Sequence, residues 1–125
     1  KLKSFMEFAN GYCCFMNDKI HSQIILSFDG YSVEVNLVNS AIYSTLEEDK
    51  GLHYLPPHCI DALGTPTGAE LAITVMHHSP DWYNDEQKNM IEVKLHEKCS
   101  IVFYGHEHYI SCKRIENEDS DPILN

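Results

Sequence analysis

Hydrophobic and polar positions alternate along the first part of this chain in a way that predicts two paired strands. The segment from Ile24 to Asp29 is a short apolar run, and the Asp-Gly-Tyr sequence that closes it is typical of a hairpin turn. In the next run, Tyr31 to Ser40, apolar residues at 33, 35 and 37 alternate with polar residues at 32, 34 and 36. Successive side chains of a strand point to opposite faces, so we expect the apolar set to be buried and Ser32, Glu34 and Asn36 to face solvent.

The second half of the chain predicts a strand, a helix and another strand. Leu71 to Met76 is apolar without polar alternation, which favours a strand in the middle of a sheet, covered on both faces. From Asn84 to Cys99, apolar residues at 91, 95 and 99 form one stripe, which predicts an amphipathic helix. Ser100 to Tyr104 reads as the next buried strand and Tyr109 to Ile115 as a further one. This order implies a parallel pair joined by a right-handed crossover, and therefore an α/β fold with a mixed sheet. The prolines at 56 and 57 also predict a short helix that ends at Gly64.

Composition and charge fit a soluble protein with one folded domain. The chain has 125 residues, of which 43% are hydrophobic and 22% are charged. Its net charge of -10 disfavours binding to nucleic acid or to an anionic membrane, and part of that charge lies in an acidic tail, residues 116–125. No apolar run reaches the roughly 18 residues of a membrane helix. The five cysteines are odd in number and form no Cys-x-x-Cys pair, so we expect free thiols in a reducing compartment, the cytoplasm.

Histidines follow both of the buried strands in the second half of the chain. His77 and His78 come directly after the first, and His106 and His108 follow the second after one glycine. The carboxyl ends of neighbouring parallel strands meet at one crevice, so these imidazoles should converge there. Histidine nitrogen suits Zn, Fe, Mn or Ni, and a pair of such ions about 3.5–4 Å apart activates water against a phosphoester. The alternative is a set of polar rings that are partly exposed or hydrogen-bonded to the backbone.

The segments "VMHHSPDWY" and "IVFYGHEH" resemble the last two motifs of the calcineurin-like metallophosphoesterases. The resemblance implies an αββα sandwich with two divalent metal ions, Mn, Fe, Zn or Ni, and hydrolysis of phosphomonoesters or phosphodiesters. On this pattern His77, His106 and His108 are metal ligands, and His77 and His106 are also the catalytic residues. Serine follows the His-His pair where many members have proline, so His78 stays open as a register alternative or a substrate contact. Trp82 and Tyr83 are candidate substrate contacts too, with packing against the following helix as the alternative.

The earlier motifs of that family, Asp-x-His, Gly-Asp and Gly-Asn-His, do not occur in this sequence. The resemblance therefore implies that residues 1–115 are the carboxyl-terminal portion of a phosphoesterase domain, inactive by itself, whose partners are a phosphoester substrate and an amino-terminal half that supplies carboxylates. Lys1 in place of methionine agrees with a preceding segment. The alternatives are a catalytically inactive scaffold module with the same fold and a site for a single metal ion.

The remaining histidines are expected at the surface. His53 and His58 lie near the two prolines and can reach the crevice through a loop, but surface positions are the simpler interpretation. His21 and His96 are assigned to the surface as well. Glu107 alternates with the two histidines around it, so it should point away from the metal ions.

Overall fold

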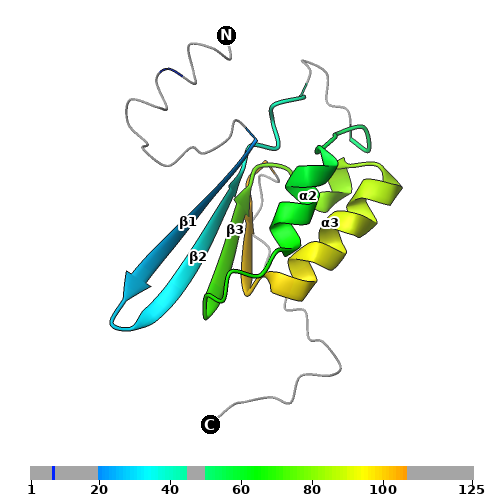
Figure 1. The fold of residues 1–125 in the computed structure, drawn as a ribbon. Helices are drawn as coiled ribbons and strands as arrows, with labels where there is room; N and C mark the ends of the chain where they lie inside the picture. Colours follow the sequence, from blue (N-terminus) through cyan, green and yellow to red (C-terminus); the bar gives the residue numbers. More distant parts are fainter. Residues whose placement is uncertain (1–6, 8–19, 45–49, 107–125) are drawn as a thin grey trace.

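The computed structural model describes residues 7, 20–44 and 50–106, which form a four-stranded sheet with helices packed on it (Figure 1). The strands are β1 (His21–Phe28), β2 (Tyr31–Val38), β3 (Leu71–Met76) and β4 (Ile101–Tyr104), in the spatial order β1-β2-β3-β4. β1 runs antiparallel to β2, and β2, β3 and β4 are parallel. The predicted α/β class, the mixed sheet and the central place of β3 are confirmed. The expected strand at 109–115 lies outside the described residues.

The helices begin and end where the sequence signals them. They are α2 (Pro57–Gly64), the 3-10 turn η1 (Pro80–Trp82) and α3 (Asp85–Lys98). Proline occupies the first turn of α2, where its missing N–H costs nothing. The side chain of Asn84 caps α3 by accepting a hydrogen bond from the backbone N–H of Gln87 at 2.9 Å. Both predicted helices are therefore confirmed.

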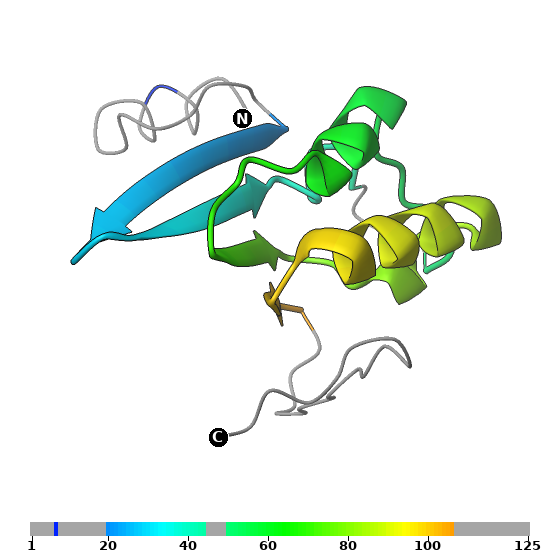
Figure 2. The same ribbon diagram turned by 60° about the horizontal axis from the view of Figure 1, so that its bottom comes forward.

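Both helices lie on the same face of the sheet, as Figures 1 and 2 show. This agrees with the topology, because the crossovers from β2 to β3 and from β3 to β4 move in the same direction along the sheet. Crossovers between parallel strands are right-handed as a rule, so two that move in one direction place their helices on one face. The core lies between this face and the helices: Val38, Leu55, Ile60, Leu63, Met76, Trp82, Tyr83, Ile91 and Leu95. In the described part of the chain, no helix has the length and apolar character needed to cross a bilayer.

The predicted orientation of β2 is wrong. The polar residues Glu34 and Asn36 are 1% and 0% exposed, and they face the helices, whereas Leu37 on the other face is 37% exposed. The Glu34 carboxylate can be buried because Lys98 at the end of α3 approaches it to 2.5 Å, and Asn36 and Thr67 also donate hydrogen bonds to it. Burial raises the pKa of the Glu34 carboxyl, but these donors and the positive charge outweigh burial and hold the pKa below its usual range.

The opposite face of the sheet is apolar, and no described helix or strand covers it. Its exposed members come from all four strands: Leu26, Phe28, Tyr31, Leu37, Val75, Ile101 and Phe103. Phe28 and Phe103 are more than half exposed, at 59% and 55%. The prediction that β3 is covered on both faces is therefore wrong for the described residues, because only the side that packs against the helices is buried. An apolar sheet face of this breadth is typical of a surface that packs against something else.

Candidate metal centre

The register of β3 and β4 brings the histidines together. The two parallel strands pair from Ile73 with Ile101 to Met76 with Tyr104, so they end side by side. The backbone N–H of Gly105 donates a further hydrogen bond, of 3.1 Å, to the carbonyl of Met76 and extends this pairing. The residues that follow both strands therefore leave the sheet at the same point. The predicted convergence of the two strand ends is confirmed.

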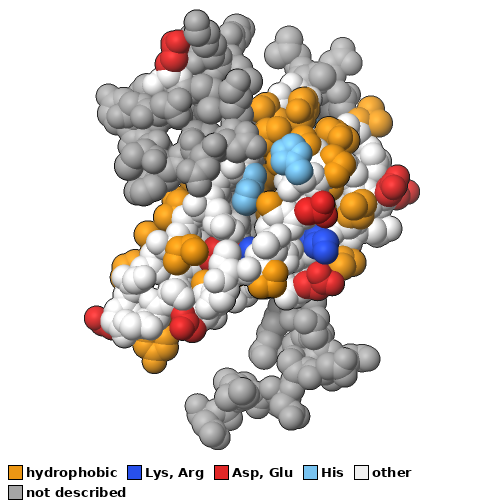
Figure 3. Space-filling view, in the orientation of Figure 1, with side chains coloured by type: hydrophobic (Ala, Val, Ile, Leu, Met, Phe, Trp, Pro, Cys, Tyr) orange, Lys and Arg blue, Asp and Glu red, His pale blue; other side chains and the backbone are white. Residues whose placement is uncertain are grey.

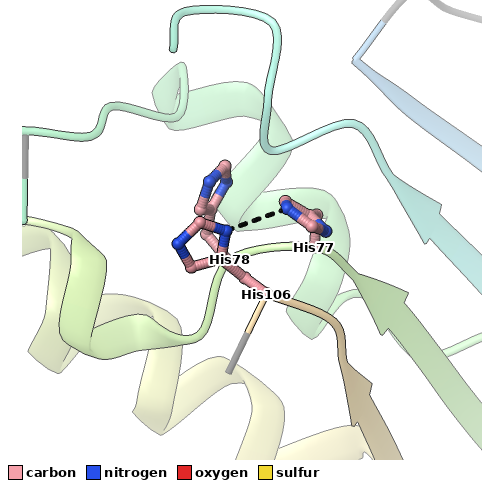
Figure 4. Close-up of side chains that lie close together, drawn as sticks. All are labelled: His77, His78 and His106. Carbon is pink, nitrogen blue, oxygen red and sulfur yellow. Dashed lines mark hydrogen bonds between the residues drawn. The ribbon is translucent and has the colours of Figure 1, made fainter. Parts of the chain in front are cut away.

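Three imidazoles form the cluster: His77 and His78 after β3, and His106 after β4 (Figure 4). His106 Nδ1 lies 3.0 Å from His77 Nε2. Ring centroids are 4.7 Å apart for His77 and His78, and 4.9 Å apart for His78 and His106. Each histidine offers one nitrogen, and these nitrogens all lie within 4.8 Å of one another. His78 is buried, His106 is half-buried and His77 is exposed, so the cluster opens to solvent on one side.

This donor set fits a divalent transition metal ion. Three histidine nitrogens around one ion, with a position left for water, are the ligands of several catalytic zinc sites, with Zn–N distances of about 2.0–2.1 Å. Two such bonds at the tetrahedral angle place their nitrogens about 3.3 Å apart, close to the 3.0 Å between His77 and His106. Ligation needs neutral imidazole. Burial, helped by the neighbouring histidines, lowers the pKa of His78 to about 4, so this ring is neutral at physiological pH. The cluster can therefore hold a metal ion.

Ser40, which comes two residues after β2, ties a third strand end to the cluster. Its buried hydroxyl oxygen accepts hydrogen bonds from the backbone N–H groups of His77, at 3.1 Å, and His78, at 2.9 Å. The same oxygen lies 3.2 Å from His78 Nδ1. Ser40 therefore fixes both the backbone and the ring of the His77–His78 pair, which is the kind of support that metal-ligating histidines have in proteins. Sequence analysis gave Ser40 no role, since a serine after a strand carries no signal for a contact 38 residues away.

The backbone directly after β4 approaches the cluster closely. A Cβ added at Gly105 would lie 2.7 Å from His77 Nδ1, so only glycine leaves room for this ring. His106 follows with a φ of 56°, which is uncommon for a residue other than glycine. Such backbone conformations cluster at functional sites, where surrounding contacts hold them in place.

Trp82 and Tyr83 lie behind the cluster. The Trp82 ring is 4.3 Å from that of His106, yet its side chain is only 7% exposed. Tyr83 is 2% exposed, and burial raises the pKa of its phenol. Both residues belong to the hydrophobic core and pack on the buried side of the cluster. Their burial favours the packing role over the substrate contact that the sequence analysis also considered.

One surface prediction is wrong. His53 is only 8% exposed, and its ring centroid lies 4.1 Å from that of His78. The loop between β2 and α2 brings it against His78, because the loop's backbone pairs with the segment around Trp82. His58 and His96 are exposed, as predicted, and His21 is half-buried beside Asn36.

One predicted metal ligand, His108, lies outside the described residues. So does Glu107, which the sequence analysis expects to point away from the metal ions. Within residues 20–44 and 50–106, the group with metal-binding spacing contains only histidines, with no carboxylate that could bridge two ions. The described cluster could therefore hold a metal ion through its three histidines alone.

Figure 3 shows histidine side chains at the surface of the molecule, with hydrophobic side chains gathered beside them.

Comparisons with protein-family models, with curated proteins and with solved structures found no match. The cluster's geometry and the two sequence motifs therefore carry the functional interpretation.

Proposed function

We propose that this protein is a metal-dependent phosphoesterase, and that the described residues form the histidine-rich half of its metal centre. The observation that carries the proposal is the convergence of His77, His78 and His106 at the ends of two adjacent parallel strands, with nitrogens within 4.8 Å of one another. The resemblance of the surrounding segments to the last two calcineurin-like metallophosphoesterase motifs supplies the reaction class. Phosphomonoesters and phosphodiesters are both candidate substrates.

The residues of this chain have distinct tasks in that reaction. Bound metal lowers the pKa of water and offsets charge on phosphate oxygens. His77, His78 and His106 would hold it, and His108 would add a ligand by resemblance to the family. Ser40 keeps the His77–His78 pair in place through three contacts. The core around Trp82 excludes water from the inner side of the cluster, which strengthens electrostatic interactions there.

The uncovered apolar face supports the sandwich that the family resemblance implies. Two sheets that pack face to face bury their inner apolar sides about 10 Å apart. Here the helices cover one side of the sheet, and side chains such as Phe28, Val75 and Phe103 remain exposed on the other. On this proposal a second sheet of the same domain covers that face, and it supplies the carboxylates that bridge a pair of ions.

The experiment combines metal analysis with hydrolysis of an aryl phosphomonoester and an aryl phosphodiester by the full-length protein. We expect His77→Ala and His106→Ala to abolish metal retention and to lower hydrolysis by several orders of magnitude. His96→Ala is the matched control, because His96 is exposed on the last turn of α3, at the other end of the helix from the cluster, and should behave as wild type. Full hydrolysis by the His77 and His106 variants refutes the proposal. Metal binding without any hydrolysis supports the scaffold alternative instead.

A further inference from the structure

His53 is a buried histidine that borders the cluster without belonging to the group of three. Its ring is tilted by 43° against that of His78 at a centroid distance of 4.1 Å. It also meets the rings of Trp82 at 5.6 Å and Tyr83 at 6.1 Å in edge-on contacts. Its nitrogens are not among those that lie within 4.8 Å of one another. His53 therefore contacts the ring of His78 but is not one of the three candidate ligands.

The backbone holds His53 in this position. Its N–H donates a hydrogen bond of 3.1 Å to the carbonyl of Trp82, and the N–H of Gly51 donates one of 2.9 Å to the same oxygen. An isolated bridge pairs His53 with Tyr83 in the parallel sense. These bonds fix the loop before any ligand enters, which is what a preorganised binding residue requires.

The ring carries a polar atom that the described residues leave unsatisfied. His53 Nδ1 is buried, and no hydrogen-bond partner for it exists among the atoms of the described residues. Leaving a buried polar atom unpaired is costly, and such an atom in a native protein calls for a bound water, ion or ligand as its partner. A partner for this nitrogen would have to lie beside the His78 ring, whose centroid is 4.1 Å from that of His53.

The chemistry of the neighbours narrows the class of that partner. A cation held by three neutral imidazoles keeps its full positive charge, so it attracts an anion. If Nδ1 of His53 carries the ring proton, it donates a hydrogen bond and needs an oxygen acceptor about 2.9 Å away. The apolar edges of Trp82 and Tyr83 exclude competing water and strengthen such a bond. A tetrahedral oxyanion, the shape of a phosphoryl group, satisfies both requirements.

We infer that His53 is a substrate-binding residue whose Nδ1–H donates a hydrogen bond to an oxygen of the phosphoryl group, next to the ion held by His77, His78 and His106. The inference rests on the proposed function and extends it, because it assigns one contact of the phosphate to the loop between β2 and α2. Neither the histidine motifs nor their spacing includes this residue.

The test measures binding of inorganic phosphate to the metal-loaded, full-length protein by calorimetry. His53→Phe keeps an aromatic ring of similar shape but removes the donor, and His53→Leu removes it in a second way. Each is expected to weaken phosphate binding about tenfold or more, the effect of one lost hydrogen bond to a charged group. Affinity for the metal itself should stay within about twofold of wild type, since His53 is not a ligand. His53→Gln, whose amide can donate, should recover part of the loss, and His96→Ala should change nothing.

The outcomes separate this inference from the proposed function. If the wild-type protein binds metal and phosphate and either folded donor-free variant binds phosphate equally well, the inference is wrong and the proposed function stands. If those variants lose the metal, His53 is a ligand and the inference is again wrong. If the wild-type protein binds metal but neither binds phosphate nor hydrolyses any phosphoester, the proposed function itself fails, and the inference fails with it.

Discussion

Replacing Gly105 by alanine tests whether the backbone directly after β4 sets the position of the His77 ring. The new Cβ would lie 2.7 Å from His77 Nδ1 and 3.5 Å from both Cε1 and the backbone oxygen of His77. Non-bonded heavy atoms prefer separations of at least about 3.5 Å, so the ring has to retreat by about 0.8 Å. Metal ligands keep their distances within about 0.2 Å. The retreating ring would carry His77 Nε2, the nitrogen nearest His106, out of the ligand set. His78 and His106 would remain in place.

We expect Gly105→Ala to weaken metal binding by about 10- to 100-fold, the range observed when the support of a ligand is disturbed. The assay is titration of the metal-free protein with Co²⁺ or Zn²⁺ against a competing chelator, with urea unfolding to verify the fold. Gly64→Ala is the matched control, because its Cβ would meet only the flexible side chain of Lys94 and can be accommodated without backbone movement. Wild-type metal affinity in a folded Gly105→Ala protein would show that the close approach does not place His77.

Three further changes probe the scaffold and the cluster. Lys98→Met leaves the buried Glu34 carboxylate uncompensated and should lower the free energy of unfolding by about 3–5 kcal/mol in urea titrations, whereas adding Glu34→Leu should restore most of it. Ser40→Ala removes the acceptor of two N–H groups and should cost about 1–3 kcal/mol, with weaker metal binding. The pKa of His78 is about 4 in the folded protein and about 6.5 in the unfolded chain. Protons therefore bind the unfolded chain first as the pH falls, and this histidine should lower the free energy of unfolding of the metal-free protein by about 1.4 kcal/mol per pH unit between pH 6.5 and pH 4, with no such loss above pH 6.5. A His78→Gln protein should lack this contribution to the slope.

The sequence predicted the elements well, because their signals are local. The apolar run of β3, the stripe at 91 and 95 on α3 and the proline start of α2 all depend on neighbours within a few residues. The convergence of His77 and His106 was also predictable, since parallel strands joined by a helix must end at the same edge. One topological rule was enough to bring together residues 29 positions apart.

What the sequence did not reveal depends on long-range contacts. Alternation along β2 shows which residues share a face, but it does not show which face the helices cover. Glu34 is buried because its cation, Lys98, arrives from the end of α3, 64 residues later, and no pattern around β2 announces it. His53 was assigned to the surface for the same reason: its burial depends on backbone pairing with the segment around Trp82.

The two sides of the sheet explain why a histidine cluster without carboxylates is found together with an exposed apolar face. The helix side is packed by the core, and the carboxylate of Glu34, although buried there, is paired with Lys98. The other side exposes Phe28, Val75 and Phe103, and Val75 lies just two residues before His77. A sheet laid on this face would therefore end beside the cluster, where the residues after its own strands could approach His77, the most exposed of the three imidazoles. On the proposed function, one second sheet would both cover the apolar face and supply the carboxylate ligands. The two roles fit together because the apolar face borders the histidine cluster.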